Sequence, residues 1–383
     1  MSLESPERVI GRFGGNERGP TVVIVGGLHG NEPSGVAASR RVLDKLRQRN
    51  PRFRGEFLAL SGNIPALMLG RRYINEDLNR IWSRERIERV TAGKKARSEE
   101  EHQLGELLLE IDAVLKRAGP EAYFLDLHST SAPGSAFSVF ADTLRNRRLA
   151  SVLPCPMVLG LEEHLQGTLL NYINERGYPA VGFEGGQNEA ASSIDTHELG
   201  IWHTLAATGC LNASDIPELL NAKPDGRAIQ DRLPEIVEIR HRHEIYAGEA
   251  FVMQPGFRNL GRVEKGELLA HDKHGDVRCL ESGFILMPLY QAQGNDGFFL
   301  VGSVRPFWLR ISAGLRAIRL GGLLRYLPGV HRRGEDTLIV NSRIARWVVV
   351  EVFHLLGFRR QRPEGRMQVF TRRREKPVQP SLS

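Results

Sequence analysis

Residues Val22–Gly35 have the sequence VVIVGGLHGNEPSG, in which an apolar run is followed by two glycines, a histidine and a glutamate. A continuous β-branched run is typical of a buried parallel strand. Gly26 and Gly27 end the run and favour a sharp turn, because glycine tolerates backbone conformations that other residues avoid. His29 and Glu32 should then lie at the carboxyl end of a strand, where open α/β sheets place their functional sites. An imidazole and a carboxylate on one turn are suitable zinc ligands.

Further strand-like segments follow this stretch at Phe57–Ser61, Tyr123–His128 and Ala180–Glu184, with helical segments between them. Such alternation predicts an α/β fold with a mostly parallel sheet flanked by helices. We assign residues 1–225 to this domain. Residues 226–305 hold short strand-like runs separated by glycine, which predicts a second, small all-β domain of barrel or sandwich type.

The charge of the chain is unevenly distributed. The 383 residues carry a net charge of +7, but residues 306–383 alone contain sixteen Arg or Lys against five Asp or Glu, so the rest is net acidic. The basic balance therefore does not predict nucleic-acid binding. We expect a basic C-terminal extension that is partly helical near Phe307–Leu327, with a disordered end, RRREKPVQPSLS. Such a helix can contact an anionic membrane or a partner, although packing on its own protein is more common.

Cysteine content and hydropathy indicate the cellular compartment of the protein. Cys155, Cys210 and Cys279 are far apart and form neither a disulfide framework nor a CxxC pair. The first residues, MSLESPERV, show no secretory signal, and no segment approaches the roughly 18–20 apolar residues of a membrane-spanning helix. These features predict a cytoplasmic protein.

Two more polar residues stand at the ends of predicted strands. His128 closes YFLDLH, and Glu184 closes AVGFE. Because a catalytic zinc ion usually has three protein ligands and one open position, His29, Glu32 and His128 can hold one ion. The metal would activate a water molecule and polarise a carbonyl. Glu184 is then available as the carboxylate that takes up and relays the proton.

Other charged residues can complete such a site. Ligating histidines usually donate their second ring N–H to a carboxylate, and Asp77 and Asp126 are candidates for this role. The loop RRYINEDLNR supplies Arg80 and Asn79, which can bind a substrate carboxylate, and Arg72, which can stabilise an oxyanion. Each signal is weak alone, but their joint placement at three strand ends favours a catalytic site. The remaining histidines lack this context and are interpreted as ordinary surface or core residues.

The segments GGLHGNEPSG, NIPA, RRYINEDLNR, DLH and GFEGGQ follow one another across residues 22–187. In this order and spacing they resemble the succinylglutamate desuccinylase/aspartoacylase family, a branch of the zinc carboxypeptidase superfamily. The resemblance implies a zinc-carboxypeptidase-like fold with one Zn²⁺ per chain on His29, Glu32 and His128. It implies that Glu184 acts first as general base and then as general acid.

The resemblance also assigns roles in the arginine-rich loop. It implies that Arg72 polarises the carbonyl, that Asn79 and Arg80 bind a substrate carboxylate, and that Asp77 supports a metal ligand. Members of the family hydrolyse the amide bond of N-acyl amino acids. We therefore predict a zinc-dependent deacylase that acts on a small N-acyl amino acid or a similar amide.

The sequence departs from the family in the regions that set specificity. Aspartoacylase-like members carry a further arginine shortly before the catalytic glutamate, but Ile173 occupies that position and Arg176 is out of register. The strand that ends at Glu184, PAVGFE, is one residue longer than in those family members. Tyr246 and Tyr290 are the candidates for a tyrosine that the small domain donates to the site.

Two alternatives remain open. A zinc carboxypeptidase acting on peptides would use the same Asn79 and Arg80 contacts, although a small domain over the pocket would exclude long substrates. A catalytically silent binding protein could share the fold and be held at a membrane or partner by the basic extension. The presence of all three ligands and of Glu184 argues against the silent protein.

Overall fold

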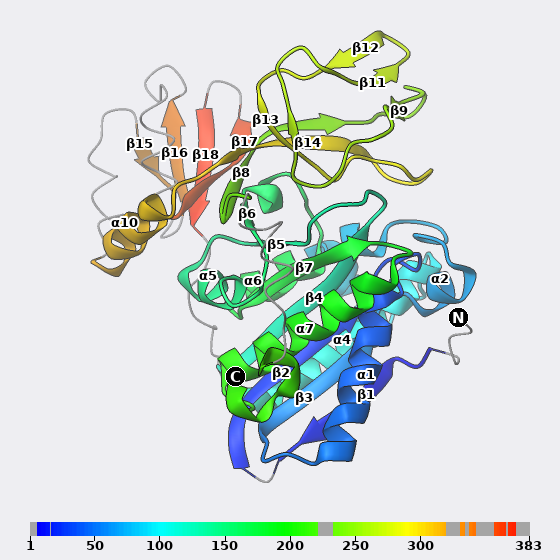
Figure 1. The fold of residues 1–383 in the computed structure, drawn as a ribbon, viewed down its shortest axis with the longest axis vertical. Coiled ribbons are helices and arrows are strands. Elements are labelled where there is room, and N and C mark those ends of the chain that lie inside the picture. The colour runs from blue at the N-terminus through cyan, green and yellow to red at the C-terminus, as the bar shows by residue number, and fades with distance from the viewer. Residues whose placement is uncertain are drawn as a thin grey trace.

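The main sheet organises the whole molecule. The computed structural model describes residues 6–15, 17–220, 233–318, 330–333, 337–341, 356–364 and 367–372. Its largest element is an eleven-stranded sheet with the order β1-β3-β2-β4-β7-β5-β6-β8-β14-β13-β10 (Figure 1). Helices flank the part of the sheet formed by the first half of the chain. The predicted α/β fold class is confirmed.

The first seven strands contain the motifs of the predicted site. They are β1 (Val9–Gly14), β2 (Glu17–Gly26), β3 (Arg54–Ser61), β4 (Ala122–Thr130), β5 (Phe137–Phe140), β6 (Met157–Leu159) and β7 (Ala180–Gln187). β2 is parallel to both β3 and β4, and β4 is parallel to β7. β1 and β5 run antiparallel to β3 and β7. The carboxyl ends of β2, β4 and β7 therefore meet at one edge of the sheet.

The helices connect these strands and cover both faces. They are α1 (Ser34–Arg49), α2 (Ile64–Leu69), η1 (Leu78–Arg80), α3 (Arg84–Thr91), α4 (Glu99–Ala118), α5 (Leu144–Ala150), η2 (Leu161–Glu163), α6 (Leu169–Glu175), α7 (Ala191–Thr208), η3 (Ala213–Asp215) and α8 (Pro217–Leu220). The segment NIPA forms the start of α2, and the Asn63 side chain caps this helix by accepting a hydrogen bond from the backbone N–H of Ala66.

Successive residues of β2 point to opposite sides of the sheet, and each side is buried. Val22 and Ile24 pack in a core formed with α1 and α7, whereas Val23 and Val25 pack in a second core with α4 and α6. All four side chains are 1 % exposed or less. Figure 1 shows α1 and α7 on one side of the sheet and α4 on the other. Because both faces of β2 are buried, apolar residues occupy successive positions of this run with no polar residues between them.

A second β region extends the same sheet. β8 (Ile236–Glu244) pairs in parallel with β6, and β14 (Asp296–Ser303), β13 (Gly283–Leu286) and β10 (Gly261–Val263) follow in antiparallel pairs. β9 (Val252–Met253), β11 (Leu268–Asp272) and β12 (Gly275–Arg278) form a separate three-stranded sheet. The region is all-β, as expected. The division proposed after residue 225 falls within residues 221–232, outside the described residues.

The described part of the C-terminal extension contains the helix α10 and strands that the sequence analysis did not predict. α10 (Pro306–Ala317) is followed by β15 (Val330–Arg332), β16 (Thr337–Asn341), β17 (Phe358–Glu364) and β18 (Met367–Arg372), which form a four-stranded antiparallel sheet. On α10, Leu309 packs against the main core, while Phe307 and Trp308 are exposed. The rest of the predicted helix, residues 319–327, and the chain end after Arg372 lie outside the described residues. Among the residues described, no helix is both long and apolar enough to cross a membrane.

Candidate active site

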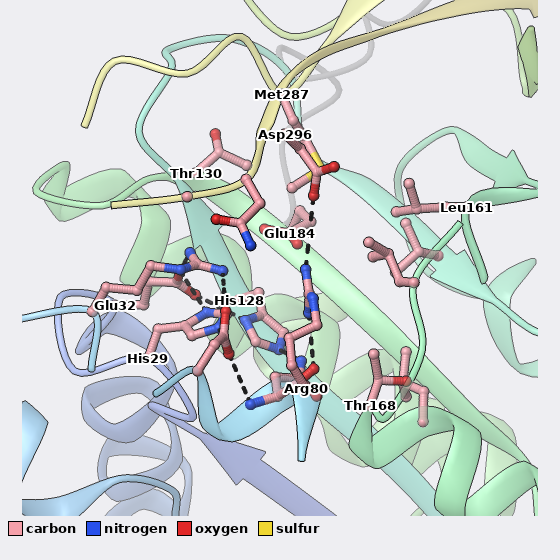
Figure 2. Close-up of a pocket in the computed structure, with 18 of the residues that line it drawn as sticks. His29, Glu32, Arg80, His128, Thr130, Leu161, Thr168, Glu184, Met287 and Asp296 are labelled. Carbon is pink, nitrogen blue, oxygen red and sulfur yellow. Dashed lines mark hydrogen bonds and ion pairs between the residues drawn. The ribbon is translucent and has the colours of Figure 1, made fainter. Parts of the chain in front are cut away.

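A cavity of about 420 Å³ lies at the carboxyl ends of β2, β4 and β7. Its lining includes eight of the nine residues predicted from the sequence: His29, Glu32, Arg72, Asp77, Asn79, Arg80, His128 and Glu184. The ninth, Asp126, lies beside His128 on β4. Figure 2 shows His29, Glu32, Arg80, His128 and Glu184 converging on one space from several segments of the chain. The structure thus brings together residues spread over more than 150 positions of sequence.

Glu32 joins the two histidines of the cluster. Its Oε1 lies 2.9 Å from Nδ1 of His29, and its Oε2 lies 2.8 Å from Nδ1 of His128. One ligand atom from each of the three residues can be chosen so that all lie within 4.8 Å of one another. Burial alone would raise the pKa of Glu32, but the two imidazoles hold it below its ordinary value. Two ring nitrogens and an ionised carboxylate are a donor set that fits Zn²⁺.

The other ring nitrogen of each histidine faces a carboxylate. Nε2 of His29 lies 3.0 Å from Oδ1 of Asp77, and Nε2 of His128 lies 3.0 Å from Oδ2 of Asp126. A carboxylate at Nε2 favours the tautomer that carries its proton there, which leaves Nδ1 as the free lone pair. Both imidazoles are therefore oriented with Nδ1 toward Glu32, as a shared metal would require.

The glycine turn places His29 and Glu32 by close backbone packing. Gly27 has φ of +72°, a conformation that side-chain-bearing residues rarely adopt. A Cβ on Gly30 would lie 2.0 Å from the carbonyl carbon of Ala66, so the turn can approach α2 only without a side chain there. The first residues of α1 are also packed tightly, because a Cβ on Gly35 would lie 2.6 Å from Cβ of Leu127. These contacts bring the turn beside β4 and its His128.

Glu184 reaches the cavity from the strand next to His128. In the register of β4 and β7, Glu184 is the direct partner of His128. Its side chain is buried, and its Oε2 has no hydrogen-bond partner among the described residues. Burial raises the pKa of Glu184 to about 7, and the nearby Glu32 adds to this effect while His128 opposes it. A carboxylate with a raised pKa beside a metal cluster is suited to exchange a proton near neutral pH.

Arg72 and Asn79 of the loop have distinct contacts. Arg72 donates to Oδ2 of Asp77 at 3.0 Å and lies 3.5 Å from Oε1 of Glu32, while its buried Nε has no partner among the described residues. Oδ1 of Asn79 accepts a hydrogen bond from the backbone N–H of Leu169 at 2.9 Å, and its amide nitrogen lies 3.3 Å from Nε2 of His128. Arg72 is thus placed beside Glu32, and the side-chain oxygen of Asn79 is already engaged by the protein.

Glu100 anchors this loop and was not singled out from the sequence. This fully buried residue of α4 accepts hydrogen bonds from the backbone N–H groups of Ile74, Asn75 and Glu76 at 2.7 to 3.3 Å. It also accepts one from the side-chain amide of Asn63 at 3.0 Å. Glu100 therefore fixes the segment that carries the cavity arginines. Glutamate is common in the first turn of a helix because it complements the helix dipole, so no local pattern identifies this role.

His197 is a second residue that the sequence analysis passed over. It was interpreted as an ordinary histidine, yet its Nε2 donates to the carbonyl oxygens of His128 at 2.9 Å and Phe183 at 3.3 Å. A Cβ on Gly185 would lie 2.3 Å from this Nε2, which explains the glycine after Glu184. Burial lowers the pKa of His197 to about 4, so the ring is neutral. His197 ties together the strands that carry a proposed ligand and the proposed base.

The second β region forms part of the cavity wall. Met287, Gln291 and Asp296 line the cavity, and Gln291 accepts a hydrogen bond from the Asn31 side chain at 2.9 Å. Neither candidate tyrosine lines it. Tyr246 is exposed, and the hydroxyl of Tyr290 donates to the backbone oxygen of Gln254 at 2.8 Å.

The position of the additional arginine was the main departure from the family pattern. Ile173 of α6 is fully buried in the hydrophobic core that α6 shares with α4. The guanidinium of Arg176 lies 3.6 Å from the centre of the Tyr172 ring and does not line the cavity. Among the lining residues, the guanidinium groups are those of Arg72 and Arg80.

Part of the chain is similar to known proteins. Residues 18–199 match the model of the succinylglutamate desuccinylase/aspartoacylase catalytic domain. An N-acyl-aromatic-L-amino acid amidohydrolase (carboxylate-forming) of Xenopus tropicalis is 30 % identical over 165 residues, which are 38 % of this chain and 50 % of that protein. A succinylglutamate desuccinylase of Photorhabdus laumondii is 34 % identical over 62 residues, 16 % of this chain and 19 % of that protein.

Solved structures show the same fold. A succinylglutamate desuccinylase/aspartoacylase from Rhodobacter sphaeroides superposes with a TM-score of 0.56 at 19 % identity, over 78 % of this chain and 88 % of that one. Succinylglutamate desuccinylase from Vibrio cholerae gives 0.56 at 15 % identity, over 79 % and 93 %.

The site brings together His29, Glu32 and His128, a cluster that could hold a metal ion. Residues 18–199 match the catalytic-domain model of the succinylglutamate desuccinylase/aspartoacylase family, so the predicted resemblance is confirmed. The chain spans half or less of the length of the curated relatives that it matches.

Proposed function

We propose that this protein is a zinc-dependent deacylase that hydrolyses the amide bond of a small N-acyl amino acid or similar amide. The observation that carries the proposal is the orientation of the two histidines: both Nδ1 atoms contact the Glu32 carboxylate, while each Nε2 contacts a carboxylate of Asp77 or Asp126. The family match over residues 18–199 and the curated names of its relatives support hydrolysis of such amides.

In the proposed reaction, His29, Glu32 and His128 hold the metal. A zinc ion there supplies a water molecule of lowered pKa and polarises the amide carbonyl. Glu184 takes the proton from the attacking water and returns it to the leaving nitrogen, a role that suits its raised pKa. Arg72, beside Glu32, is placed to stabilise the negative charge that develops on the carbonyl oxygen.

Arg80 binds the substrate carboxylate. Its Nη1 donates to the backbone oxygen of Asn79 at 2.8 Å, which holds the side chain against the cavity wall. The remaining N–H groups can form a charge-assisted contact with one carboxylate. The substrate is thus positioned between Arg80 and the metal cluster.

The alternative of a peptide carboxypeptidase shares these contacts, but the wall contributed by Met287, Gln291 and Asp296 favours small substrates. Product analysis on N-acetylmethionine and a tetrapeptide distinguishes the two. We expect the zinc-loaded chain to release acetate and methionine and to leave the peptide intact. Chelation should abolish the activity, and added Zn²⁺ should restore it. Full activity of a metal-free preparation would contradict the proposal.

A further inference from the structure

The cavity wall carries a carboxylate that the proposed reaction does not use. Asp296 begins β14, in the β region beyond the matched catalytic domain. Figure 2 shows Asp296 facing Arg80. Oδ1 of Asp296 accepts a hydrogen bond from Nε of Arg242 at 2.5 Å, and Oδ2 lies 3.8 Å from Nη2 of Arg80. The group proposed to bind the substrate carboxylate therefore has a fixed negative charge beside it.

Asp296 leaves Arg80 able to bind a ligand. The separation of 3.8 Å between Asp296 and Arg80 is longer than a hydrogen bond, whereas the contact of Asp296 with Arg242 is a short one. The guanidinium groups of Arg80 and Arg242 thus flank Asp296, and Nη2 of Arg242 also lies 3.5 Å from Oε1 of Glu244. One substrate carboxylate can pair with the guanidinium of Arg80, and a charge in a buried site needs such a partner.

A second substrate carboxylate would find no further arginine of this kind in the described cavity lining. The cavity lining contains two arginines and six carboxylates, those of Glu32, Glu76, Asp77, Glu162, Glu184 and Asp296. Arg72 is already bound to Asp77 at 3.0 Å. Like charges repel strongly in a site shielded from water. A dicarboxylate would therefore place its second charge among carboxylates, with Asp296 next to the first.

Much of the remaining wall is apolar. The apolar side chains that line it include Val139, Phe140, Leu161, Leu165, Leu170, Met287 and Leu289. Figure 2 shows Leu161 and Met287 at the edge of the space above Arg80. Burial of an apolar group against such a surface is favourable, whereas burial of an unpaired charge is costly.

We propose that Asp296 is a specificity-determining residue that restricts the site to N-acyl amino acids with one carboxylate and an apolar second group. This inference rests on the proposed deacylase function and narrows its substrate class. Asp296 acts by its charge, through repulsion of a second carboxylate. The apolar wall then receives the side chain or the acyl chain of the substrate.

The test compares substrates that differ in charge at similar size. The zinc-loaded full chain is assayed on N-acetylmethionine against N-acetylaspartate, and on N-butanoylalanine against N-succinylalanine. We expect the neutral member to have a kcat/KM at least about 100-fold higher in one pair or both, because a buried site discriminates strongly against an unpaired charge. Preference for the dicarboxylate in both pairs would overturn the inference.

Two variants assign the effect to Asp296. D296N should raise kcat/KM for the dicarboxylate substrate, because it removes a negative charge that repels the second carboxylate. The ratio of kcat/KM between the neutral substrate and the dicarboxylate should therefore fall about tenfold. D276N removes an exposed carboxylate from β12 of the same region and should leave the ratio unchanged. A ratio in D296N within twofold of the wild-type value would contradict a role for Asp296.

Binding of simple carboxylates separates this inference from the proposed reaction, because binding needs no turnover. Inhibition or calorimetric titration should show butyrate binding about tenfold more tightly than succinate, and D296N should lose that preference. Equal binding of the two by the wild-type chain would overturn the charge selectivity. Selective binding with no hydrolysis of any N-acyl amino acid would instead reject the proposed function and leave the selectivity in place.

Discussion

Asp142 and Arg359 lie 217 positions apart in the sequence, and Oδ2 of Asp142 accepts hydrogen bonds from Nε and Nη2 of Arg359 at 3.2 and 3.0 Å. Arg316 of α10 donates to the same oxygen at 2.8 Å, and Arg147 donates to Oδ1 at 2.5 Å. Asp142 directly follows two cavity-lining residues, Phe140 and Ala141. Arg316 and Arg359 of the C-terminal extension therefore pair with a buried carboxylate inside the protein. This carboxylate, Asp142, lies next to the residues that form the apolar wall of the cavity.

Loss of the Asp142 charge should destabilise the fold. D142N leaves three guanidinium groups around a neutral amide, and breaking a buried ion pair in this way costs about 3 kcal/mol. Urea unfolding of the full chain measures the change. As a control, D195N removes an exposed carboxylate paired with Arg41 and should shift stability by less than about 0.5 kcal/mol. Equal stabilities of D142N and the wild type would contradict the account.

The stabilisation from Asp142 should depend on pH. Burial alone would raise its pKa, but Arg316, Arg359 and Arg147 hold the pKa well below its ordinary value. The unfolded chain takes up a proton near pH 4, so the contribution is full above about pH 5 and is lost as the pH falls through the folded pKa. The difference between the unfolding free energies of wild type and D142N should narrow progressively as the pH falls below about 5. A gap that widens in acid would disagree with this sign.

The anchor at Glu100 should control the position of the arginines. E100Q weakens four hydrogen bonds to an ionised carboxylate that hold residues 74–76 and Asn63. Because bonds of this kind contribute about 1.5 to 3 kcal/mol each, we expect kcat/KM to fall about tenfold or more, with a raised KM. E99Q changes the neighbouring, partly exposed glutamate and is the matched control. Unchanged kinetics of E100Q would show that the loop is held by other contacts.

His197 should act as a positioning residue for the metal cluster. H197F removes the N–H that binds the carbonyl oxygens of His128 and Phe183 while it keeps an aromatic ring in the core. Zinc affinity should fall about tenfold, which is typical of lost support behind a metal ligand. Competition with a chromogenic chelator measures this change, and H102Q, at an exposed histidine, serves as the reference. A zinc affinity of H197F equal to that of the wild type would exclude the role.

Local patterns explain why the centre of the fold was predictable. The four residues Val22–Val25 are buried on both faces, so a continuous apolar run identified a central strand without any long-range information. His29 lies three residues after β2, whereas β4 and β7 continue for two and three residues beyond His128 and Glu184. Parallel neighbours necessarily bring their carboxyl ends together, and this rule placed residues from three segments in one cavity.

The residues that the sequence analysis missed act through long-range contacts. Arg359 and Asp142 are joined only by the folding of β17 against the β5–α5 connection, and nothing in either local sequence points to the other. The strands at 330–372 lie in an arginine-rich segment whose composition resembles a solvated surface. Asp296 is an acidic residue at a strand start, and its relation to Arg80 depends on how β14 joins the sheet.

The assignment of Glu184 as the proton carrier is tested by one comparison of the zinc-loaded wild-type chain with E184Q. Zinc content and hydrolysis of N-acetylmethionine are measured on the same samples, and E189Q, an exposed glutamate five positions further on, is the control. We expect E184Q to retain one zinc ion per chain and to lose about 1000-fold or more in kcat, since a positioned general base contributes on this order. An E184Q protein that holds zinc and retains a kcat within tenfold of the wild-type value would contradict the mechanism.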